Sequence, residues 1–399
     1  MQPGERLAST VRDTGGWPVL VVQRAPGELY LQGGAALRPG EAPPLRRPGD
    51  PAPGWLERVD PVSLETISRS VDLPSGGWLW CGGVVAHANG DLYMVNGRFC
   101  HRLDPSCRVV AERELPLDSP YNGLLILSDG NLVTRNLGFR ADDRAGFIVL
   151  EPEELRPVAE LEIPERCMAR FSCDRAADRE YLYFTTPREV RRLTYCSGRL
   201  ELDRDWASSY DVSVDQSDAW DTTIGSDSIW LMDMGRPPAW LGRAKAPQRA
   251  FRFSIEDPGD RDVVDVIGRP GAWNPSPPTY DPTRQILVHF DSINSRIVAH
   301  RYERGAPLRL LWEQPFRNLT QMIVWLDTGE LVVEDSRSPD PLARDPSADA
   351  VLVDIETGSE IGRAPIGAAA TTGMFCSPGF DRDFYVCSIA GAVAHVYVQ

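Results

Sequence analysis

The chain has 399 residues, of which 42% are hydrophobic and 25% are charged, and it contains 34 glycines and 34 prolines. This composition is typical of a soluble, turn-rich globular protein. A formal net charge of −15 argues against a general nucleic-acid binder, which needs a basic surface to neutralise phosphates, and against attachment to anionic membranes by bulk charge.

A degenerate hairpin recurs about eight times along the chain. Each copy has an apolar stretch, a turn often built on Asn-Gly, Asp-Gly or Thr-Gly, and a short strand of the type x-Leu-Tyr or x-Leu-Val. The clearest copies are Val84–Asn96, Leu124–Asn136 and Met322–Asp335. Alternation of apolar and polar residues predicts strands throughout, and no segment has a long helical period. Self-similarity at this period predicts an all-β chain folded as a β-propeller.

The second strand of each hairpin has an apolar centre that aligns between copies. In chain order the centres are Leu29, Leu92, Leu132, Leu182, Ile229, Ile286, Leu331 and Phe384. Their spacing suits blades of four strands, which require about 40–50 residues each. The first interval is the longest because a proline-rich insertion occupies residues 37–54. Proline lacks a backbone donor, so we expect a surface loop there.

A second repeat lies between the hairpins. It reads as strand, acidic turn, strand, and its copies are Trp55–Glu65, Cys100–Val109, Val149–Arg156 and Val351–Ser359. Asp-Pro begins the turn in the first two copies, as expected for a tight turn. These segments fit the two outer strands of a blade.

The last module, Thr372–Gln399, has room for only three strands. We expect its fourth strand to come from residues near Leu7–Arg12, within an N-terminal arm of residues 1–16. Such pairing of the chain ends closes the ring and removes exposed sheet edges. The count predicts a single domain over residues 1–399 with eight blades. Seven blades is the alternative, if the N-terminal module is a partial blade.

Compartment and thiol chemistry follow from what the sequence lacks. No N-terminal apolar run precedes a small-residue cleavage site, and no run of about 18 apolar residues exists, so we expect a cytoplasmic protein without a membrane partner. None of the eight cysteines forms Cys-x-x-Cys or lies at zinc-finger spacing from histidine. We therefore expect buried free thiols.

The repeat also predicts where a site would lie. The glycine turns lie on one face of the ring, while the ends of the second strands and the connections between blades lie on the other. Five second strands end on, or directly precede, an oxygen-bearing side chain: Asn96, Asn136, Asp233, Asp291 and Asp335. Oxygen ligands that converge near an axis suit a hard cation such as Ca²⁺ or Mg²⁺. The alternative at each position is an ordinary turn residue that bonds its own backbone.

Candidate roles can be assigned on this face. The candidate metal ligands are Asn122, Asn136 and Asp335. The candidate substrate-binding residues are Tyr121, Trp220, Asp221, Trp273, Asn274 and Gln321, which lie in or next to inter-blade connections. The candidate catalytic residues are Asp291, His289 and Asp233. His289 precedes Asp291 by two residues on a predicted strand, so both side chains point to one face and can act as an acid–base pair. A strand histidine can equally be a packed structural residue.

Ser119–Asn136 (SPYNGLLILSDGNLVTRN) resembles the Pro-Asn-Gly…Asp-Gly stretch of the SMP-30/gluconolactonase and strictosidine-synthase-like propellers. In that superfamily the asparagine of Asn-Gly is a divalent-metal ligand, so the resemblance implies that role for Asn122. The match covers under a tenth of the chain. The family's metal-binding glutamate in a Glu-Gly-Pro context has no counterpart here, and those families have six blades.

Two functional hypotheses follow. The first is an enzyme of hydrolase, lyase or isomerase type that acts on a small, partly apolar molecule in an axial pocket, with a divalent metal or an Asp–His pair. The second is a non-catalytic propeller that binds a ligand or a protein partner. Residues 37–54 and the loops Gly235–Ala250 and Ser336–Asp349 would then be contact segments. The sequence contains no Gly-x-Ser-x-Gly elbow, phosphate loop or dinucleotide fingerprint that would indicate another chemistry.

Overall fold

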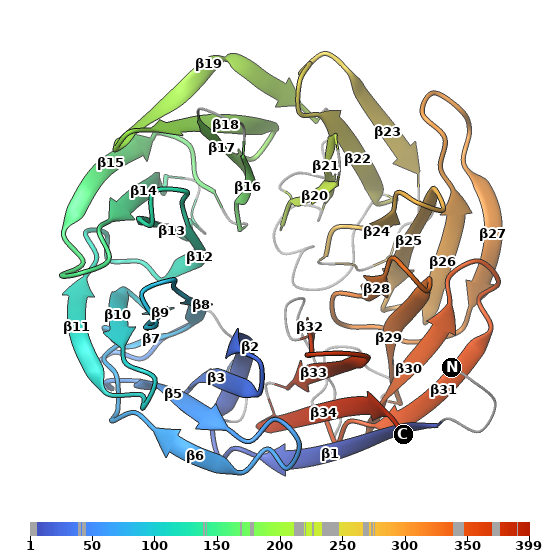
Figure 1. Cartoon of the computed structure of the whole chain (residues 1–399). Helices are drawn as coiled ribbons and strands as arrows, with labels where there is room; N and C mark the ends of the chain where they lie inside the picture. The colour runs from blue at the N-terminus through green and yellow to red at the C-terminus, as the bar shows by residue number, and fades with distance from the viewer. Residues whose placement is uncertain are drawn as a thin grey trace.

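The computed structural model describes residues 6–38, 41, 45–138, 140, 142–167, 170–175, 179–210, 219, 221–225, 227–233, 247–265, 271–272, 274, 276–337, 347–368, 376–388 and 390–399. These residues form 34 β-strands and no helix, and hence no helix that could cross a membrane. Eight antiparallel sheets of four strands and one two-stranded sheet account for all of them. The four-stranded sheets follow one another around a ring (Figure 1), which confirms the predicted eight-bladed propeller.

The first four blades each use four strands that are consecutive along the chain, apart from the two short strands of the ninth sheet. Blade 1 comprises β2 (Trp17–Ala25), β3 (Glu28–Gly34), β5 (Gly54–Val59) and β6 (Thr66–Arg69). Blade 2 comprises β8 (Cys81–Ala86), β9 (Leu92–Asn96), β10 (Phe99–Leu103) and β11 (Val109–Glu114). Blade 3 comprises β12 (Tyr121–Ile126), β13 (Leu132–Asn136), β14 (Ala145–Leu150) and β15 (Pro157–Ile163). Blade 4 comprises β16 (Ser172–Arg175), β17 (Glu180–Thr185), β18 (Glu189–Cys196) and β19 (Arg199–Ser209).

The second half of the ring repeats this order, and only the last blade departs from it. Blade 5 comprises β20 (Thr223–Gly225), β21 (Ser228–Met232), β22 (Arg249–Ser254) and β23 (Arg261–Asp265). Blade 6 comprises β24 (Thr279–Asp281), β25 (Ile286–Asp291), β26 (Arg296–Arg301) and β27 (Arg309–Gln314). Blade 7 comprises β28 (Ile323–Trp325), β29 (Glu330–Ser336), β30 (Ala348–Asp354) and β31 (Glu360–Pro365). Blade 8 comprises β32 (Cys376–Pro378), β33 (Asp383–Cys387), β34 (Ala392–Val398) and β1 (Leu7–Asp13).

The core lies between the blades. All eight apolar centres of the predicted repeat fall in the second strand of a blade, and each is at most 1% exposed. Buried clusters join side chains from adjacent blades, as where Val133 of blade 3 packs with Phe184 of blade 4. Because a single blade cannot bury both faces of its sheet, the ring is stable only as a whole.

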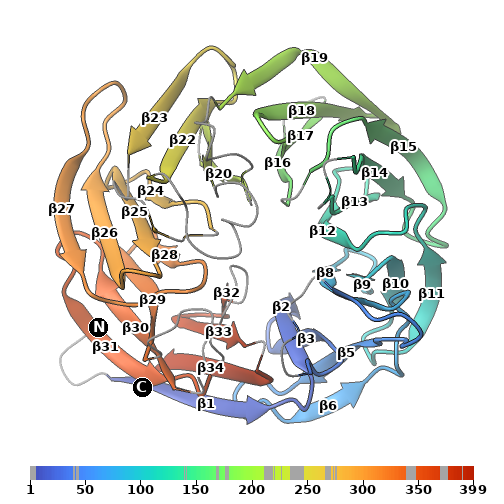
Figure 2. The same ribbon diagram turned by 180° about the vertical axis from the view of Figure 1, so that it is seen from behind.

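The chain ends close the ring, as the sequence predicts. Strand β1 pairs with β34 in antiparallel register from Leu7 opposite Val398 to Asp13 opposite Ala392. Both views of the ring show β1 along the outer edge of blade 8, beside blade 1 (Figures 1 and 2). Arg12 of β1 also reaches blade 1, where its Nη2 lies 2.5 Å from Oε2 of the buried Glu57. This ion pair fastens the closing strand to blade 1.

The proline-rich insertion carries one short strand that the sequence did not predict. Strand β4 (Leu45–Arg46) pairs with β7 (Trp78–Leu79), which leads into blade 2. The two residues of β4 directly follow a pair of prolines, so their backbone donors are available for pairing. The insertion is therefore held against the connection between blades 1 and 2.

Candidate functional site

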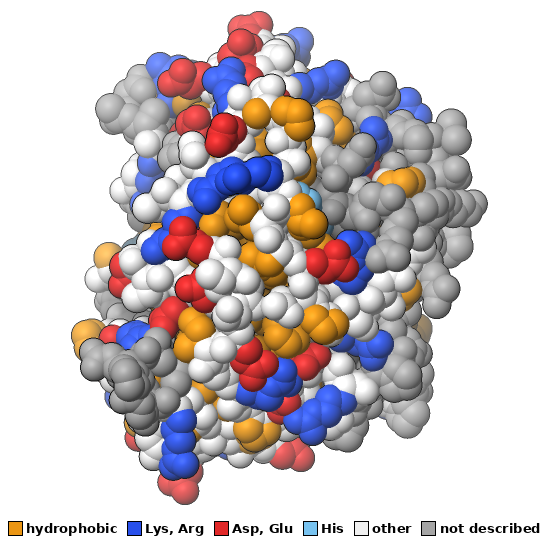
Figure 3. All heavy atoms as spheres, turned by 90° about the vertical axis from the view of Figure 1, so that its right-hand side faces the viewer, with side chains coloured by type: hydrophobic (Ala, Val, Ile, Leu, Met, Phe, Trp, Pro, Cys, Tyr) orange, Lys and Arg blue, Asp and Glu red, His pale blue; other side chains and the backbone are white. Residues whose placement is uncertain are grey.

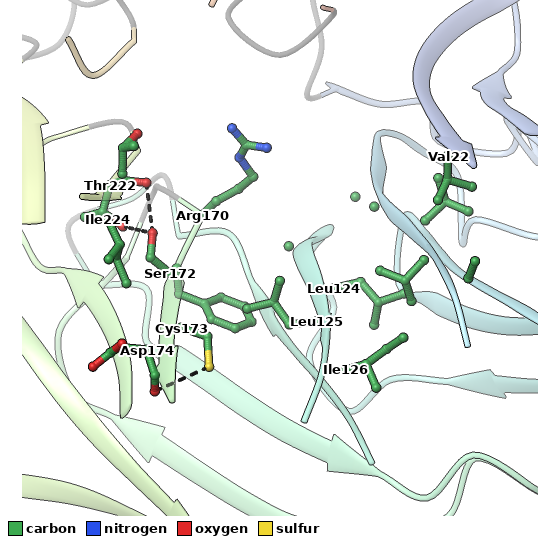
Figure 4. A pocket seen from close by; sticks show the side chains of 18 of the residues that line it. Val22, Leu124, Leu125, Ile126, Arg170, Ser172, Cys173, Asp174, Thr222 and Ile224 are labelled. Carbon is green, nitrogen blue, oxygen red and sulfur yellow. Dashed lines mark hydrogen bonds between the residues drawn. The ribbon is translucent and has the colours of Figure 1, made fainter. Parts of the chain in front are cut away.

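The described residues line an open cavity of about 1030 Å³ along the inner strands of blades 1 to 5. One part of its wall is apolar and comes from Val22, Val84, Val85, Leu124, Leu125 and Ile126. The facing part is more polar and comes from Arg170, Ser172, Cys173, Thr222 and Thr223. Figure 4 shows the two parts across an open space, with the side chain of Arg170 extending into that space. An axial pocket of this kind is the site that the repeat predicts.

Glycines set the shape of the apolar wall. A Cβ atom on Gly82 would lie 2.0 Å from the carbonyl oxygen of Tyr121, so β8 and β12 approach each other backbone to backbone. Gly123 has a φ of +77° at a register shift in β12. A Cβ atom there would lie 3.1 Å from the ring of Phe171 and 3.9 Å from Cβ of Arg170. Blade 3 thus meets blade 4 at a point where a side chain would be crowded.

A buried carboxylate positions the polar wall. The backbone amide of Arg170 donates to Oδ1 of Asp221 at 2.8 Å, and its Nε and Nη2 donate to Oδ2 at 3.2 and 3.1 Å. The Asp221 side chain is 1% exposed, whereas that of Arg170 is 31% exposed. Asp221, a predicted substrate-binding residue, does not line the cavity itself but binds Arg170, which does. It acts through Arg170, whose orientation it fixes.

Two further polar groups lie on the same wall. The hydroxyl of Ser172 donates to the carbonyl oxygen of Thr222 at 2.9 Å and lies 2.8 Å from the Thr222 hydroxyl, which joins blades 4 and 5. Burial, together with the nearby carboxylate of Glu180, raises the pKa of the Cys173 thiol to about 11. At neutral pH this thiol therefore stays protonated and is a weak donor, not a nucleophile.

Behind the wall, Arg135 and Asn122 lack partners for part of their polar groups. Arg135 of β13 is fully buried, and its Nη1 donates to the carbonyl oxygens of Cys167 (2.9 Å) and Asn136. Its Nε and Nη2 have no hydrogen-bond partner among the described residues. Asn122 of β12 is 1% exposed, lies opposite Arg135 in the strand register, and has an unpartnered Oδ1. Burial lowers the pKa of Arg135, because it penalises the charged form.

The predicted metal ligands do not form one site. Asn136 donates through Nδ2 to the carbonyl oxygen of Arg144 at 2.9 Å and accepts the amide of Gly146 through Oδ1 at 2.6 Å. Asp335 lies in blade 7 and binds Arg363 at 2.8 Å. No group of three or more His, Cys, Asp or Glu suited to a metal occurs in the part of the chain that the structure describes. A cation at Asn122 would face the guanidinium of Arg135, so these residues do not fit Ca²⁺ or Mg²⁺, which need a cage of oxygen atoms.

The predicted catalytic residues lie away from the described lining of the axial cavity. His289 of β25 is fully buried, with Nε2 3.2 Å from Nδ1 of His300. Oδ1 of Asp291 accepts backbone amides from the turn that follows β25 at 3.1 Å. Oδ1 of Asp233 accepts the amide of Arg249 at 2.9 Å. These contacts match the turn role that is the alternative for strand-end carboxylates, and a catalytic role stays a prediction.

The remaining predicted substrate-binding residues are dispersed. Tyr121 is buried and accepts the amide of Leu117 through its hydroxyl at 3.1 Å, and burial raises its pKa to about 12. Asn274 is fully buried and caps the amide of Ser276 at 2.9 Å. Gln321 is partly exposed and borders a small void between blades 7 and 8. Trp220 and Trp273 lie outside the described residues.

Sequence reasoning missed Arg135 and Arg170. The repeat contains a signal for Arg135. When the second strands LYMVN (92–96) and LVTRN (132–136) are aligned, Arg135 occupies the place of Val95. Val95 is fully buried in blade 2. A charged residue at a core position of a repeat is costly unless it serves a purpose. Arg170 had no such signal, since it precedes its strand.

The ring of eight blades with an axial cavity defines this chain as a β-propeller. No family model and no curated protein matches the sequence. Solved structures of similar fold include BamB from Moraxella catarrhalis, at 12% identity and a TM-score of 0.60 over 97% of this chain and 98% of that one. The Dos1 propeller (10%, 0.61, 97% and 94%) and a europium-containing methanol dehydrogenase (10%, 0.55, 97% and 93%) are also similar. At these identities the similarity shows the fold alone. The propeller fold implied by the sequence resemblance is confirmed, with eight blades in place of six.

Proposed function

We propose that this chain is an enzyme of hydrolase, lyase or isomerase type whose small-molecule substrate occupies the axial cavity. The observation that carries the proposal is the cavity itself. Its volume of about 1030 Å³ suits a small molecule, and its wall is apolar on one part and polar on the facing part. A substrate with an apolar body and a polar end would match both.

The wall residues would divide the work of binding. Leu124 and Ile126 would pack against the apolar body of the substrate and exclude water. Arg170, held by Asp221, would orient the polar end through charge-assisted hydrogen bonds. The hydroxyl of Ser172 can accept a hydrogen bond from the substrate, and the Cys173 thiol can donate one weakly. None of these roles uses a metal.

Filling the cavity tests the proposal. Thr223 of β20 is exposed and lines the cavity, so T223W would place an indole there without removing a core contact. The matched control is V263W on the outer strand β23 of the same blade, where Val263 is also exposed. Wild type and both variants would be incubated with a metabolite extract, and mass spectrometry would record which compounds are consumed. We expect consumption by wild type and V263W and its loss in T223W. No consumption by any of them would contradict an enzymatic function.

A second candidate, a non-catalytic platform for a protein partner, is favoured by one observation. Several exposed apolar side chains lie in or beside the outer strands of blades 1 and 2, among them Val62, Ile67, Val71 and Val110. On the side of the ring seen in Figure 3, which carries blades 6 and 7, acidic and basic side chains lie between smaller apolar groups. A pull-down of protein partners with wild type and an I67D/V110D variant would test this candidate. T223W is the control, because it leaves the outer strands of blades 1 and 2 unchanged. Equal recovery by all three would contradict it.

A further inference from the structure

We infer that the substrate carries an oxyanion group, a carboxylate or a phosphate, which binds the buried Nε–Nη2 edge of Arg135. The inference rests on the proposed function and specifies the chemical class of the molecule. It also assigns a ligand role to a side chain that contacts no carboxylate of the protein among the described residues.

The same edge of arginine binds carboxylates elsewhere in this chain. Arg296 holds Glu313 through Nε and Nη2 at 2.6 and 2.7 Å. Arg192 uses the same two atoms to hold a single oxygen, Oδ2 of Asp203, at 2.9 and 2.6 Å. This edge presents two parallel N–H groups whose spacing matches the two oxygens of a carboxylate or phosphate. At Arg135 the edge is buried and unpartnered, so it has the geometry for such a group without holding one.

Among the described residues, Arg135 has no carboxylate of its own to balance its charge. Asp221 is the carboxylate that attracts the Arg135 guanidinium, and its oxygens already bind Arg170. The fully buried Arg135 and the partly exposed Arg170 thus depend on one carboxylate, and that carboxylate is hydrogen-bonded to Arg170. A buried charge without a partner is costly, and a bound anion would supply the missing negative charge.

Asn122 indicates what lies next to the oxyanion. Asn122 and Arg135 are opposite each other in the register of β12 and β13, and such pairs project from the same face of a sheet. The unpartnered Oδ1 of Asn122 is an acceptor, whereas the open edge of Arg135 is a donor. A ligand that satisfies both has an oxyanion with a hydroxyl or amine donor beside it, as in a 2-hydroxy acid.

The corner adjoins the cavity. Gly123, which follows Asn122 directly, lines the cavity, and so does Arg170, which binds Asp221. The positive φ and crowded surroundings of Gly123 bring β12 against Phe171 and Arg170 at this point. Arg135 lies one strand outward from this contact. Neither Arg135 nor Asn122 lines the cavity itself, so the proposed ligand would reach Arg135 from the cavity at this contact, between β12 and β16.

Thermal unfolding in the presence of simple anions tests the inference. The probes are inorganic phosphate, acetate and glycolate, each compared with chloride at equal ionic strength. We expect a saturable rise in the Tm of the wild type with phosphate or a carboxylate, and whichever responds identifies the oxyanion. Glycolate should bind more tightly than acetate, because its hydroxyl can donate to Asn122, and N122A should remove that difference. An anion that binds only the folded state stabilises that state by mass action, so the rise in Tm reports the affinity of the anion.

Three variants make the outcome specific. R135M should weaken the anion response at least tenfold. N122D should do the same, and should also raise the Tm without anion, because it places a carboxylate opposite Arg135. R192M, which breaks the Arg192–Asp203 pair far from the corner, should lower the Tm and keep the anion response. A full response in both R135M and N122D would overturn the inference. Loss of compound consumption in T223W alongside no anion response would overturn it too, while leaving the proposed function intact.

Discussion

The hydroxyl of Tyr93 in blade 2 donates a hydrogen bond to the carbonyl oxygen of Pro152 in blade 3, at 2.9 Å. The same contact joins Tyr30 to Pro105 at 2.9 Å and Tyr385 to Pro61 at 3.0 Å. Each proline directly follows the acidic residue of an outer turn. Three successive junctions of the ring are thus fixed by one tyrosine on a second strand and one turn of the next blade.

Replacing Tyr93 by phenylalanine should lower the free energy of unfolding by about 1–2 kcal/mol. The change leaves the Pro152 carbonyl unpaired and also removes the acceptor for Asn89, whose Nδ2 donates to the tyrosine at 2.8 Å. Urea denaturation followed by fluorescence measures the loss. Y397F is the matched control, because no described contact uses that hydroxyl for a hydrogen bond. A Y93F midpoint equal to the wild-type one would show that the junction does not depend on this bond.

Replacing Gly82 by alanine should destabilise the ring by about 1–3 kcal/mol, as overpacking does. The added Cβ would lie 2.0 Å from the Tyr121 carbonyl oxygen, and backbone cannot move aside as a side chain can. G225A is the control, since a Cβ on Gly225 would meet its nearest neighbour, in Tyr280, at an ordinary 3.8 Å. Thermal unfolding of both variants checks the prediction. Equal stability of the two would mean that β8 and β12 separate without cost.

Acid should destabilise the protein through the stacked pair His289 and His300. Burial lowers the pKa of both imidazoles, and for His289 the charge of His300 lowers it further. Below pH 6.5 the unfolded chain therefore binds protons that the folded state does not, so stability falls as the pH drops below that value. Each residue would contribute up to about 1.4 kcal/mol per pH unit.

A variant with both histidines replaced by asparagine should lose part of this acid-side slope. Urea midpoints at pH 7.5, 6.5 and 5.5 would show it, with the wild type measured in parallel as the reference. An unchanged slope in H289N/H300N would mean that other groups cause the acid sensitivity.

Removal of residues 1–13 should leave blade 8 with three strands and an open edge along β34. It also deprives Glu57 of Arg12, one of its two arginine partners. We expect a lower Tm and self-association at high concentration, since an unpaired strand is a template for other chains. A synthetic peptide of residues 6–16 should restore the monomer. An unchanged Tm and a monomeric truncated chain would show that the ring does not need the pairing of β1 with β34.

Much of the fold could be read from local patterns. The spacing of Leu92, Phe384 and the other apolar centres predicted eight blades, because each centre must be buried between neighbours. The acidic turn also followed from composition, and Asp60 caps its own turn through the amide of Ser63 at 2.7 Å. The Tyr–Pro contacts could not be predicted, although both the tyrosines and the acidic residue–proline turns recur in the sequence. The offset between neighbouring blades decides which turn each tyrosine contacts, and the sequence does not give that offset.

The candidate site could be predicted only in part. The expectation that strand ends and inter-blade connections share one face of the ring singled out Asp221, which binds the cavity residue Arg170. The same expectation grouped Asp335 and Asn136 as metal ligands, although the oxygens of each already bond to nearby groups of the protein. A sequence shows that a carboxylate lies at a strand end, but it does not show whether a neighbouring arginine or backbone amide binds that carboxylate in the folded protein. Arg135 could have been found, since it replaces Val95 in the aligned hairpin.

Blade 8 takes its outer strand from one end of the chain and its other three strands from the opposite end. During synthesis, residues 7–13 leave the ribosome long before residues 392–398 that complete their sheet exist. The earlier blades can form while this segment still waits for its partner. Closure of the ring therefore waits until β34 is available to pair with β1. A chain interrupted before that point would have blades but no ring, with apolar blade surfaces open to capture by chaperones or proteases.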